Sequence, residues 1–413
     1  MAFSSHDSSS TAADSLDRSA AITVGLVPAP ELPARVVELI GDELGDLFRR
    51  YIDDRYTWHI ESLTDPVIGA DDETSELVAN ADSIRRERDW TYVLCVTDLP
   101  IFRDTTVTVA EVSETCGVAF ISLPVLGPIF LRRRVREAAI QLINELHHGS
   151  SDEARDRQQD QMRESQQTSD RTSLYNANAR QLVDSRLIKR PWRRVTPNDE
   201  TIDVRFVATS RILARCKLLT GMVRANRPWT ILPAFKGILA IAFATGAYSL
   251  IFPSLWRISD AYVLWRYALL MGVSISAMVA WLIIDHGLWE PLPKQERNVL
   301  RRLYNAATVL TLSIGVLSYY AVLFVLFALA VIVFIPADFM DRVLQHETTF
   351  GTLATLAWLV SSVATIAGAL GSSLESDEAV RNATYGFRQK RRLETMQAQN
   401  DEANSDSDRS DSN

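Results

Sequence analysis

The sequence predicts a protein in two parts, a cytoplasmic α/β domain followed by an all-α bundle of four transmembrane helices. Two observations lead to this prediction. The mean hydropathy is about zero because a polar first half is averaged with an apolar second half, which contains four long runs without a central charge. In residues 20–148, short apolar segments alternate with segments of helical periodicity, as in α/β domains.

The charge and the cysteine content of the sequence limit the kinds of partner and the environment that we expect for this protein. The net charge of −8 over 413 residues comes largely from acidic, Ser-rich ends, so nucleic acid, which requires a basic face, is not an expected partner. The three cysteines, Cys95, Cys116 and Cys216, are scattered and indicate reduced thiols. Residues 1–19 contain neither a basic start nor an apolar run of signal-peptide length, and we expect them to be disordered and not exported.

The elements expected in the head, residues 20–148, follow the order β-α-β-α-β-β-β-α. Strands are expected at 21–28, 57–63 and 90–100. The segments 106–114 and 117–124 leave no room for a helix between them, which predicts an antiparallel pair. Helices are expected at 31–54, 71–89 and from Gly127-Pro128 to His148, with apolar residues at helical spacing in the first and the last. The order predicts a two- or three-layer α/β domain.

Ligands of such sheets usually lie beyond the carboxyl ends of the parallel strands. At that edge the sequence places Thr97 and Asp98, in VTDLP, and we consider both as candidate ligand-binding residues. The alternative for Asp98 is that it starts or caps a loop.

Between the head and the membrane we expect a polar linker, residues 149–200, and a basic amphipathic segment, residues 201–229. In the latter, Ile212, Cys216, Leu219 and Val223 predict one apolar helix face. Basic residues lie off this face: Arg211, Arg215, Lys217, Arg224 and Arg227. Such a helix can rest on anionic inner-leaflet lipid; the alternative is that it packs on the cytoplasmic domain.

Four transmembrane helices are expected within residues 230–372, at 231–252, 262–284, 306–335 and 350–370, because about 20 apolar residues cross a bilayer. The third is long enough to tilt or to extend beyond the bilayer. Lys and Arg accumulate before the first span, between the second and third, and after the fourth. This pattern predicts an inner-membrane protein with cytoplasmic N- and C-termini, and residues 373–413 form a cytoplasmic tail with a disordered acidic end.

Inside the bundle, small residues four apart, such as Ala242 and Gly246, predict close helix packing, as do Ala364, Gly368 and Ser372. Lys236 and Asp285 are candidates for a structural ion pair near the inner interface. No ionisable residue is expected near the membrane midplane, where a transporter usually places one. A small-solute transporter remains an alternative if Thr308, Thr311, Ser318 and Thr365 line a polar cavity.

The segment NELHH, residues 144–148, looks like the zinc-protease pattern H-E-x-x-H with asparagine in place of the first histidine. On a helical wheel Asn144 lies opposite the apolar stripe and His148 not far from it, so both are expected to face water. Asparagine is not a zinc ligand, and no metal or cofactor is predicted. The run from VLCVTDLP through AEVSETCGVAFISLP to the last helix nevertheless resembles the archaemetzincin metalloproteases, which implies a shared scaffold without its zinc ligands.

The phrases LTGMVRANRPW, YNAATVLTLSIGVL and GSSLESDEAVRNATYGFRQ resemble a group of uncharacterised actinobacterial integral membrane proteins. The resemblance implies an α/β head on four helices. Some members are labelled methylenetetrahydrofolate dehydrogenases, but the sequence contains no dinucleotide fingerprint, Walker loop or nucleophile elbow. We therefore expect a non-enzymatic membrane protein whose head binds a ligand or a protein partner. A divergent membrane-tethered enzyme is the alternative that uses the same head.

Overall fold

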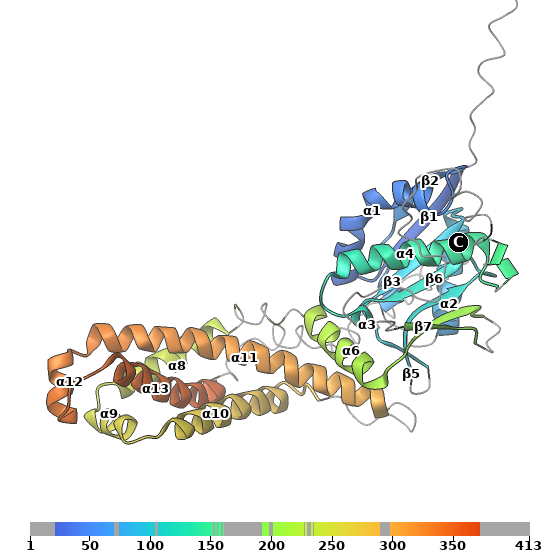
Figure 1. The fold of residues 1–413 in the computed structure, drawn as a ribbon. Coiled ribbons are helices and arrows are strands. Elements are labelled where there is room, and N and C mark those ends of the chain that lie inside the picture. The colour runs from blue at the N-terminus through green and yellow to red at the C-terminus, as the bar shows by residue number, and fades with distance from the viewer. Residues whose placement is uncertain are drawn as a thin grey trace, which may run out of the picture. The chain divides into compact units, whose positions relative to one another are not determined.

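In the computed structural model the described residues are 21–69, 74–103, 106–151, 192–197, 201–226, 235–289 and 298–371, with a few single positions between 153 and 160 and near 230. The chain divides between Leu218 and Leu219 into two compact units, which we call the head and the helical unit (Figure 1). An α/β sheet domain is thus followed by a helical region, as predicted. The disorder expected for residues 1–19 and for the tail, 373–413, concerns residues outside this description.

The head contains one sheet of eight described strands. Their bounds are β1 (Ala21–Pro28), β2 (Thr57–Ser62), β3 (Tyr92–Thr97), β4 (Ile101–Arg103), β5 (Thr106–Ser113), β6 (Val118–Ser122), β7 (Trp192–Val195) and β8 (Val204–Ala208). The order is β2-β1-β3-β6-β5-β8-β7, with β4 paired to β5. Strands β2, β1, β3 and β6 are parallel, and the remaining pairs are antiparallel. The predicted antiparallel pair of β5 and β6 is confirmed.

The sheet continues beyond residue 148, the end expected for the head. Strand β7 comes from the segment expected to be a linker, and β8 from the one expected to be juxtamembrane. Strand β8 pairs with β5, where Arg205 lies opposite Glu111 and donates a hydrogen bond of 2.7 Å from Nε to Oε1. These strands have four and five residues, too short for a periodic signal.

Helices cover both faces of the sheet. On one face α1 (Leu32–Tyr51) and α4 (Leu131–His148) pack side by side, with the short α3 (Leu123–Leu126) before α4. On the other face lie η1 (Pro66–Gly69) and α2 (Thr74–Glu87), over a core that includes Val93, Cys95 and Phe120. The contact between β1 and Trp90 requires glycine, because a Cβ on Gly25 would lie 1.8 Å from an atom of the indole.

Among the described residues of the helical unit, three helices are long and apolar enough to cross a membrane. They are α10 (Leu264–Asp285), α11 (Asn298–Phe334) and α13 (Phe350–Gly371). The first expected span, 231–252, contains α8 (Lys236–Ser249), and the segment after this span forms a short helix, α9 (Pro253–Asp260), at an angle of 91° to α8. The break precedes a proline at the start of α9. Proline cannot continue the preceding helix, and it is favoured in the first turn of the next one because an N–H would have no helical partner there. The pair would count as a fourth span if it crosses as one.

The described part of this region also includes α6 (Arg211–Ala225), which contains the division between the units, and α12 (Ala337–Leu344). Helix α11 has 37 residues, or about 55 Å at 1.5 Å per residue. It therefore exceeds the hydrocarbon thickness of about 30 Å, as its sequence predicts.

Small residues bring the helices of this unit together, as predicted. A Cβ on Gly368 would lie 2.7 Å from the hydroxyl of Tyr319 and 3.2 Å from Cβ of Ala242. A Cβ on Gly246 would lie 2.2 Å from the ring of Phe327. Glycine at these two positions permits helix contacts that any larger residue would prevent.

Candidate functional site: a histidine centre in the head

In the described head, three side chains that could bind a metal ion lie close together: Asp53, His147 and His148. We call this group the histidine centre. One ligand atom of each lies within 4.8 Å of the others. Asp53 follows α1 by two residues, and the two histidines end α4. Because α1 and α4 pack side by side with their carboxyl ends at the same edge, residues 94 positions apart in the chain meet there.

Asp53 is held in place on both its backbone and its carboxylate. Trp58 donates its indole N–H to the Asp53 carbonyl at 2.9 Å. The side chain of Asp53 is 5% exposed and accepts hydrogen bonds from Arg55 at 2.6 to 3.2 Å. These bonds lower the pKa of Asp53 to about 2, against the opposing effect of burial. The carboxylate is therefore charged at neutral pH.

His147 lies between this carboxylate and a hydroxyl. Its Nε2 is 3.5 Å from Oδ2 of Asp53, and its Nδ1 is 3.3 Å from the hydroxyl of Tyr92. The rings of Tyr56 and Trp58 pack against it edge-on at 5.4 and 5.3 Å between centroids. Burial lowers the pKa of His147, with a further contribution from His148. The imidazole is therefore neutral at neutral pH and offers a lone pair.

The second histidine completes the group. The rings of His147 and His148 are 4.7 Å apart between centroids, and Nε2 of His148 lies 3.4 Å from the carbonyl oxygen of Ile52. Both imidazoles thus point toward the chain segment that follows α1. Their position at the carboxyl end of α4 also favours a cation, because the helix dipole is negative there.

The donor set fits a transition metal ion. Zinc binds histidine nitrogen and carboxylate oxygen at about 2.0–2.2 Å, so neighbouring ligand atoms of a tetrahedral site are about 3.3 Å apart. The separation of 3.5 Å between His147 and Asp53 is close to this value. A metal would have to displace Arg55 from Oδ2, and the Arg55 side chain, 76% exposed, has room to withdraw.

The expectation that NELHH faces water is wrong. Asn144 is 4% exposed and Glu145 is 1% exposed. Arg194 of β7 places its guanidinium 3.4 Å from the carboxylate of Glu145, and it also donates to the carbonyl of Ser150. A helical wheel considers one helix alone, whereas Arg194 of β7, 49 residues after Glu145 in the chain, covers the side that was expected to face water.

The candidate residues Thr97 and Asp98 lie at the opposite end of β3, away from the histidine centre. Both are buried, at 1% and 2% exposure. The hydroxyl of Thr97 accepts a hydrogen bond of 3.0 Å from the backbone N–H of Leu99, and Ser122 donates to the Leu99 carbonyl at 2.6 Å. Thr97 therefore shapes the turn after β3, and ligand binding by these two residues stays a prediction.

The basic residues of the juxtamembrane segment differ in exposure. Arg215 and Arg224 are exposed, whereas Lys217 is partly buried, with its ammonium 5.4 Å from the ring centroid of Trp192. The side chain of Arg211 and the whole of Arg227 are outside the described part of the chain.

The apolar face expected for α6 is buried only in its second half. Ile212 is 76% exposed and Cys216 is exposed, whereas Leu219 is partly buried and Val223 is buried. Ala214, Leu218 and Met222, which were not expected on this face, are also buried. Burial along the helix thus follows residues 214, 218 and 222, whose four-residue spacing forms a stripe of its own.

Lys236 and Asp285, the expected ion pair of the bundle, do not form one between these two described side chains. Lys236 is exposed, and the carboxylate of Asp285 lies 4.0 Å from Nδ1 of His286, its neighbour in the chain.

A recess of the head lies between α1 and β2, with a volume of about 520 Å³. Its helix side carries Glu38, Asp42 and Asp46, and its strand side includes His59. Among the described strands, β2 pairs only with β1, so its other edge is unpaired. Arg49 also lines the recess, so its charged residues are of both signs.

Comparison with protein-family models, with curated proteins and with solved structures found no match for this chain. Function must therefore be inferred from the site. The histidine centre was missed because sequence reasoning placed the candidate ligand at the carboxyl edge of the sheet and compared NELHH only with a pattern inside one helix. The signal was present in Asp53 and in His147-His148, which follow or end two helices of the same α/β layer.

Proposed function

We propose that this is an integral membrane protein whose cytoplasmic head binds a divalent transition metal ion at the histidine centre. The observation that carries the proposal is the convergence of Asp53, His147 and His148, with ligand atoms within 4.8 Å, at a place stabilised by both backbone and aromatic contacts.

The chemistry of the donors selects the class of metal. Two imidazoles and one carboxylate suit Zn²⁺ and its neighbours in the first transition series better than Ca²⁺ or Mg²⁺, which prefer oxygen ligands. Tyr92 would serve as the outer partner that fixes the orientation of His147, because the ligating imidazole usually hydrogen-bonds through its second nitrogen and the two groups are 3.3 Å apart.

The membrane arrangement belongs to the same proposal. With the bent pair α8–α9 as the first span, four spans place both termini on one side, and the basic flanking residues assign this side to the cytoplasm. The hydrogen bonds of the buried hydroxyl groups in the helical unit favour the role of a membrane anchor and not that of a transport pathway. Ser361 and Thr365 are fully buried and donate to carbonyls of their own helix at 2.7 Å. Thr311 is likewise buried and accepts a bond of 3.0 Å from Asn226.

A metal-dependent enzyme is the second candidate, and one observation favours it. Three protein ligands leave a coordination position open, as in catalytic zinc sites. We place binding first because Glu145, the acidic residue of the NELHH segment, is buried beside Arg194, where it is not poised as a general base. Ester or peptide hydrolysis by the full-length protein that requires zinc and is lost in H147A would establish the enzyme instead.

The test is a titration of the full-length protein in detergent, after treatment with a chelator, with Zn²⁺ in competition with a chromophoric indicator. We expect one Zn²⁺ per chain in the wild type and loss of that site in H147A and H148A. The matched control is H59A, which removes an exposed histidine of β2 in the same head and should bind like the wild type. Equal binding by all four proteins would show that the metal lies elsewhere.

A further inference from the structure

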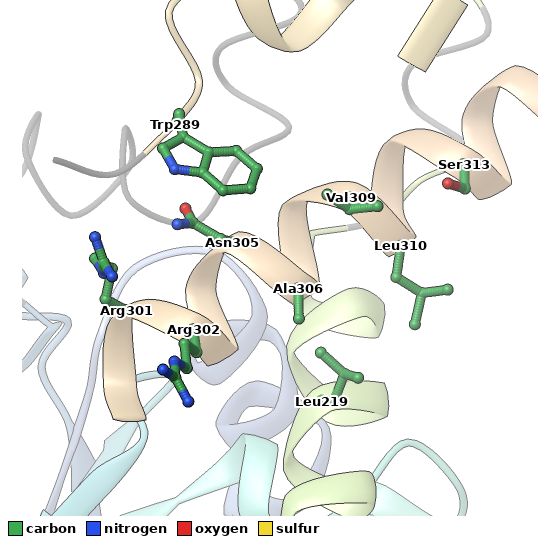
Figure 2. A pocket seen from close by; sticks show the side chains of 9 residues that line it. All are labelled: Leu219, Trp289, Arg301, Arg302, Asn305, Ala306, Val309, Leu310 and Ser313. Carbon is green, nitrogen blue, oxygen red and sulfur yellow. The ribbon is translucent and has the colours of Figure 1, made fainter. Parts of the chain in front are cut away.

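A groove of about 510 Å³ runs along α11 within the helical unit. Its lining on α11 consists of Arg301, Arg302, Asn305, Ala306, Val309, Leu310 and Ser313. These residues come in neighbouring pairs that repeat every four positions along the chain, so they lie on one side of the helix and form a continuous stripe. In Figure 2, Trp289 lies over Asn305 near one end, and Leu219 of α6 faces Ala306 further along.

The two ends of the groove differ in chemistry. Arg301 and Arg302 form the charged end, whereas Ala306, Val309 and Leu310 form an apolar wall (Figure 2). From residue 301 to residue 313 the helix rises by about 18 Å. A ligand that fills the groove therefore needs an anionic group at one end and an apolar chain at the other.

The charged end has the properties of an anion site. Among the described residues, no carboxylate lies within ion-pair distance of Arg301 or Arg302, and Nε of Arg301 is buried without a hydrogen-bond partner. A guanidinium presents its N–H donors in a planar fork that matches two oxygens of a phosphate. A phosphate here would supply the acceptor that Nε of Arg301 lacks.

The place of the groove along the helix indicates the source of the phosphate. The apolar span begins at Arg301 and ends at Phe334, and its last 20 or so residues suffice to cross the hydrocarbon. The groove then lies at the level of the lipid headgroups and the first acyl carbons. Trp289 is at the level where tryptophan is enriched in membrane proteins.

We infer that this groove binds an anionic phospholipid, with its phosphate on Arg301 and Arg302 and the start of an acyl chain along Ala306, Val309 and Leu310. The inference does not depend on the metal proposal, because every lining residue belongs to the helical unit.

The test uses full-length protein, delipidated in detergent and titrated with dioctanoyl phosphatidylglycerol, with bound lipid counted by native mass spectrometry. The double variant R301Q/R302Q should bind the lipid at least about tenfold more weakly, because two charge-assisted contacts are lost. The control R257Q/R266Q removes the same charge at two other arginines of the helical unit and should bind like the wild type. V309W narrows the apolar wall and should also weaken binding while both arginines remain.

Two further probes identify the source of the phosphate. Dioctanoyl phosphatidylcholine, which has the same chains and no net charge, should bind more weakly than phosphatidylglycerol. Inorganic phosphate at millimolar concentration should displace little lipid. If inorganic phosphate binds as tightly as the lipid, or V309W has no effect, the groove is a phosphate site and not a lipid site. If R301Q/R302Q keeps its melting temperature and binds phosphatidylglycerol like the control, the inference fails altogether.

Discussion

Replacing Asp53 with asparagine tests the histidine centre most selectively, because the asparagine side chain has the same shape as the aspartate side chain but carries no charge. An asparagine oxygen can still accept the bond of 2.9 Å that Asp53 receives from the backbone N–H of Arg55. The pKa of Asp53, lowered from 3.8 to about 2, sets an upper limit of about 2 kcal/mol on the stability lost at pH 7. Because Arg55 is 76% exposed, solvent screening reduces this loss to about 1 kcal/mol.

Metal binding should change far more than stability. The amide of D53N is neutral and is not a usual zinc ligand, so we expect the dissociation constant for Zn²⁺ to rise by more than about 100-fold, beyond the 10- to 100-fold typical of changes in the outer shell. Arg55→Ala should act in the opposite direction, because it frees Oδ2 of Asp53 from a competing cation. R55A should therefore bind Zn²⁺ more tightly than the wild type although it is less stable without metal.

The assay is the zinc competition titration of both variants, together with their melting temperatures in the presence of a chelator. The reasoning is refuted if D53N binds zinc like the wild type while its fold is intact, or if D53N and R55A shift the affinity in the same direction.

Three further predictions concern the metal-free protein. Gly25→Ala should destabilise the head by about 1–3 kcal/mol or more, because the new Cβ would overlap the ring of Trp90. The control Gly41→Ala, whose Cβ would have no described neighbour within 4 Å, should leave the melting temperature unchanged or raise it. Equal melting temperatures of the two variants would contradict the packing of β1 against Trp90. In the helical unit, Gly246→Ala should lower the melting temperature and Gly272→Ala should not, because only the first would meet a phenylalanine ring; the reverse order would contradict the close helix contact. Acidification from pH 7 to pH 5 should destabilise the head, because burial lowers the pKa of His147 in the folded protein and the imidazole therefore takes up its proton at a higher pH in the unfolded chain than in the folded one. The contribution of His147 to the pH dependence of the melting temperature should vanish in H147F. If the pH dependence is unchanged in H147F, it arises from other groups.

Much of the architecture could be predicted because its signals are local. Strands such as β3, with five consecutive buried residues, and helices such as α1 carry their own apolar pattern. The helices α10, α11 and α13, which are long and apolar enough to cross a membrane, were predicted to within a few residues of their ends, apart from the start of α11. Length and the absence of charge suffice to identify such helices.

The features that could not be predicted depend on contacts between distant segments. Strand β8 is recognisable only through its pairing with β5, and β7 only through its pairing with β8. The burial of Glu145 depends on Arg194, which no pattern within α4 reveals. The first expected span ended directly before Pro253, but the sequence did not indicate that the next eight residues form a helix, α9, at 91° to α8.

The histidine centre illustrates the same limit. Asp53 and His147 are 94 residues apart, and only the parallel packing of α1 and α4 brings them to one edge. Helices that precede and follow parallel strands on one face end at a common edge. Residues immediately after such helices can therefore be compared as one set, a rule that would have placed Asp53 with His147 and His148.

The most direct test of the central claim is X-ray absorption spectroscopy at the zinc edge on the full-length protein loaded with one equivalent of Zn²⁺. We predict a first shell of nitrogen and oxygen at about 2.0–2.1 Å, with the outer-shell scattering of two imidazoles, reduced to one in H147A and unchanged in H59A. A shell without imidazole scattering, or two imidazoles retained in H147A, would contradict metal binding at Asp53, His147 and His148.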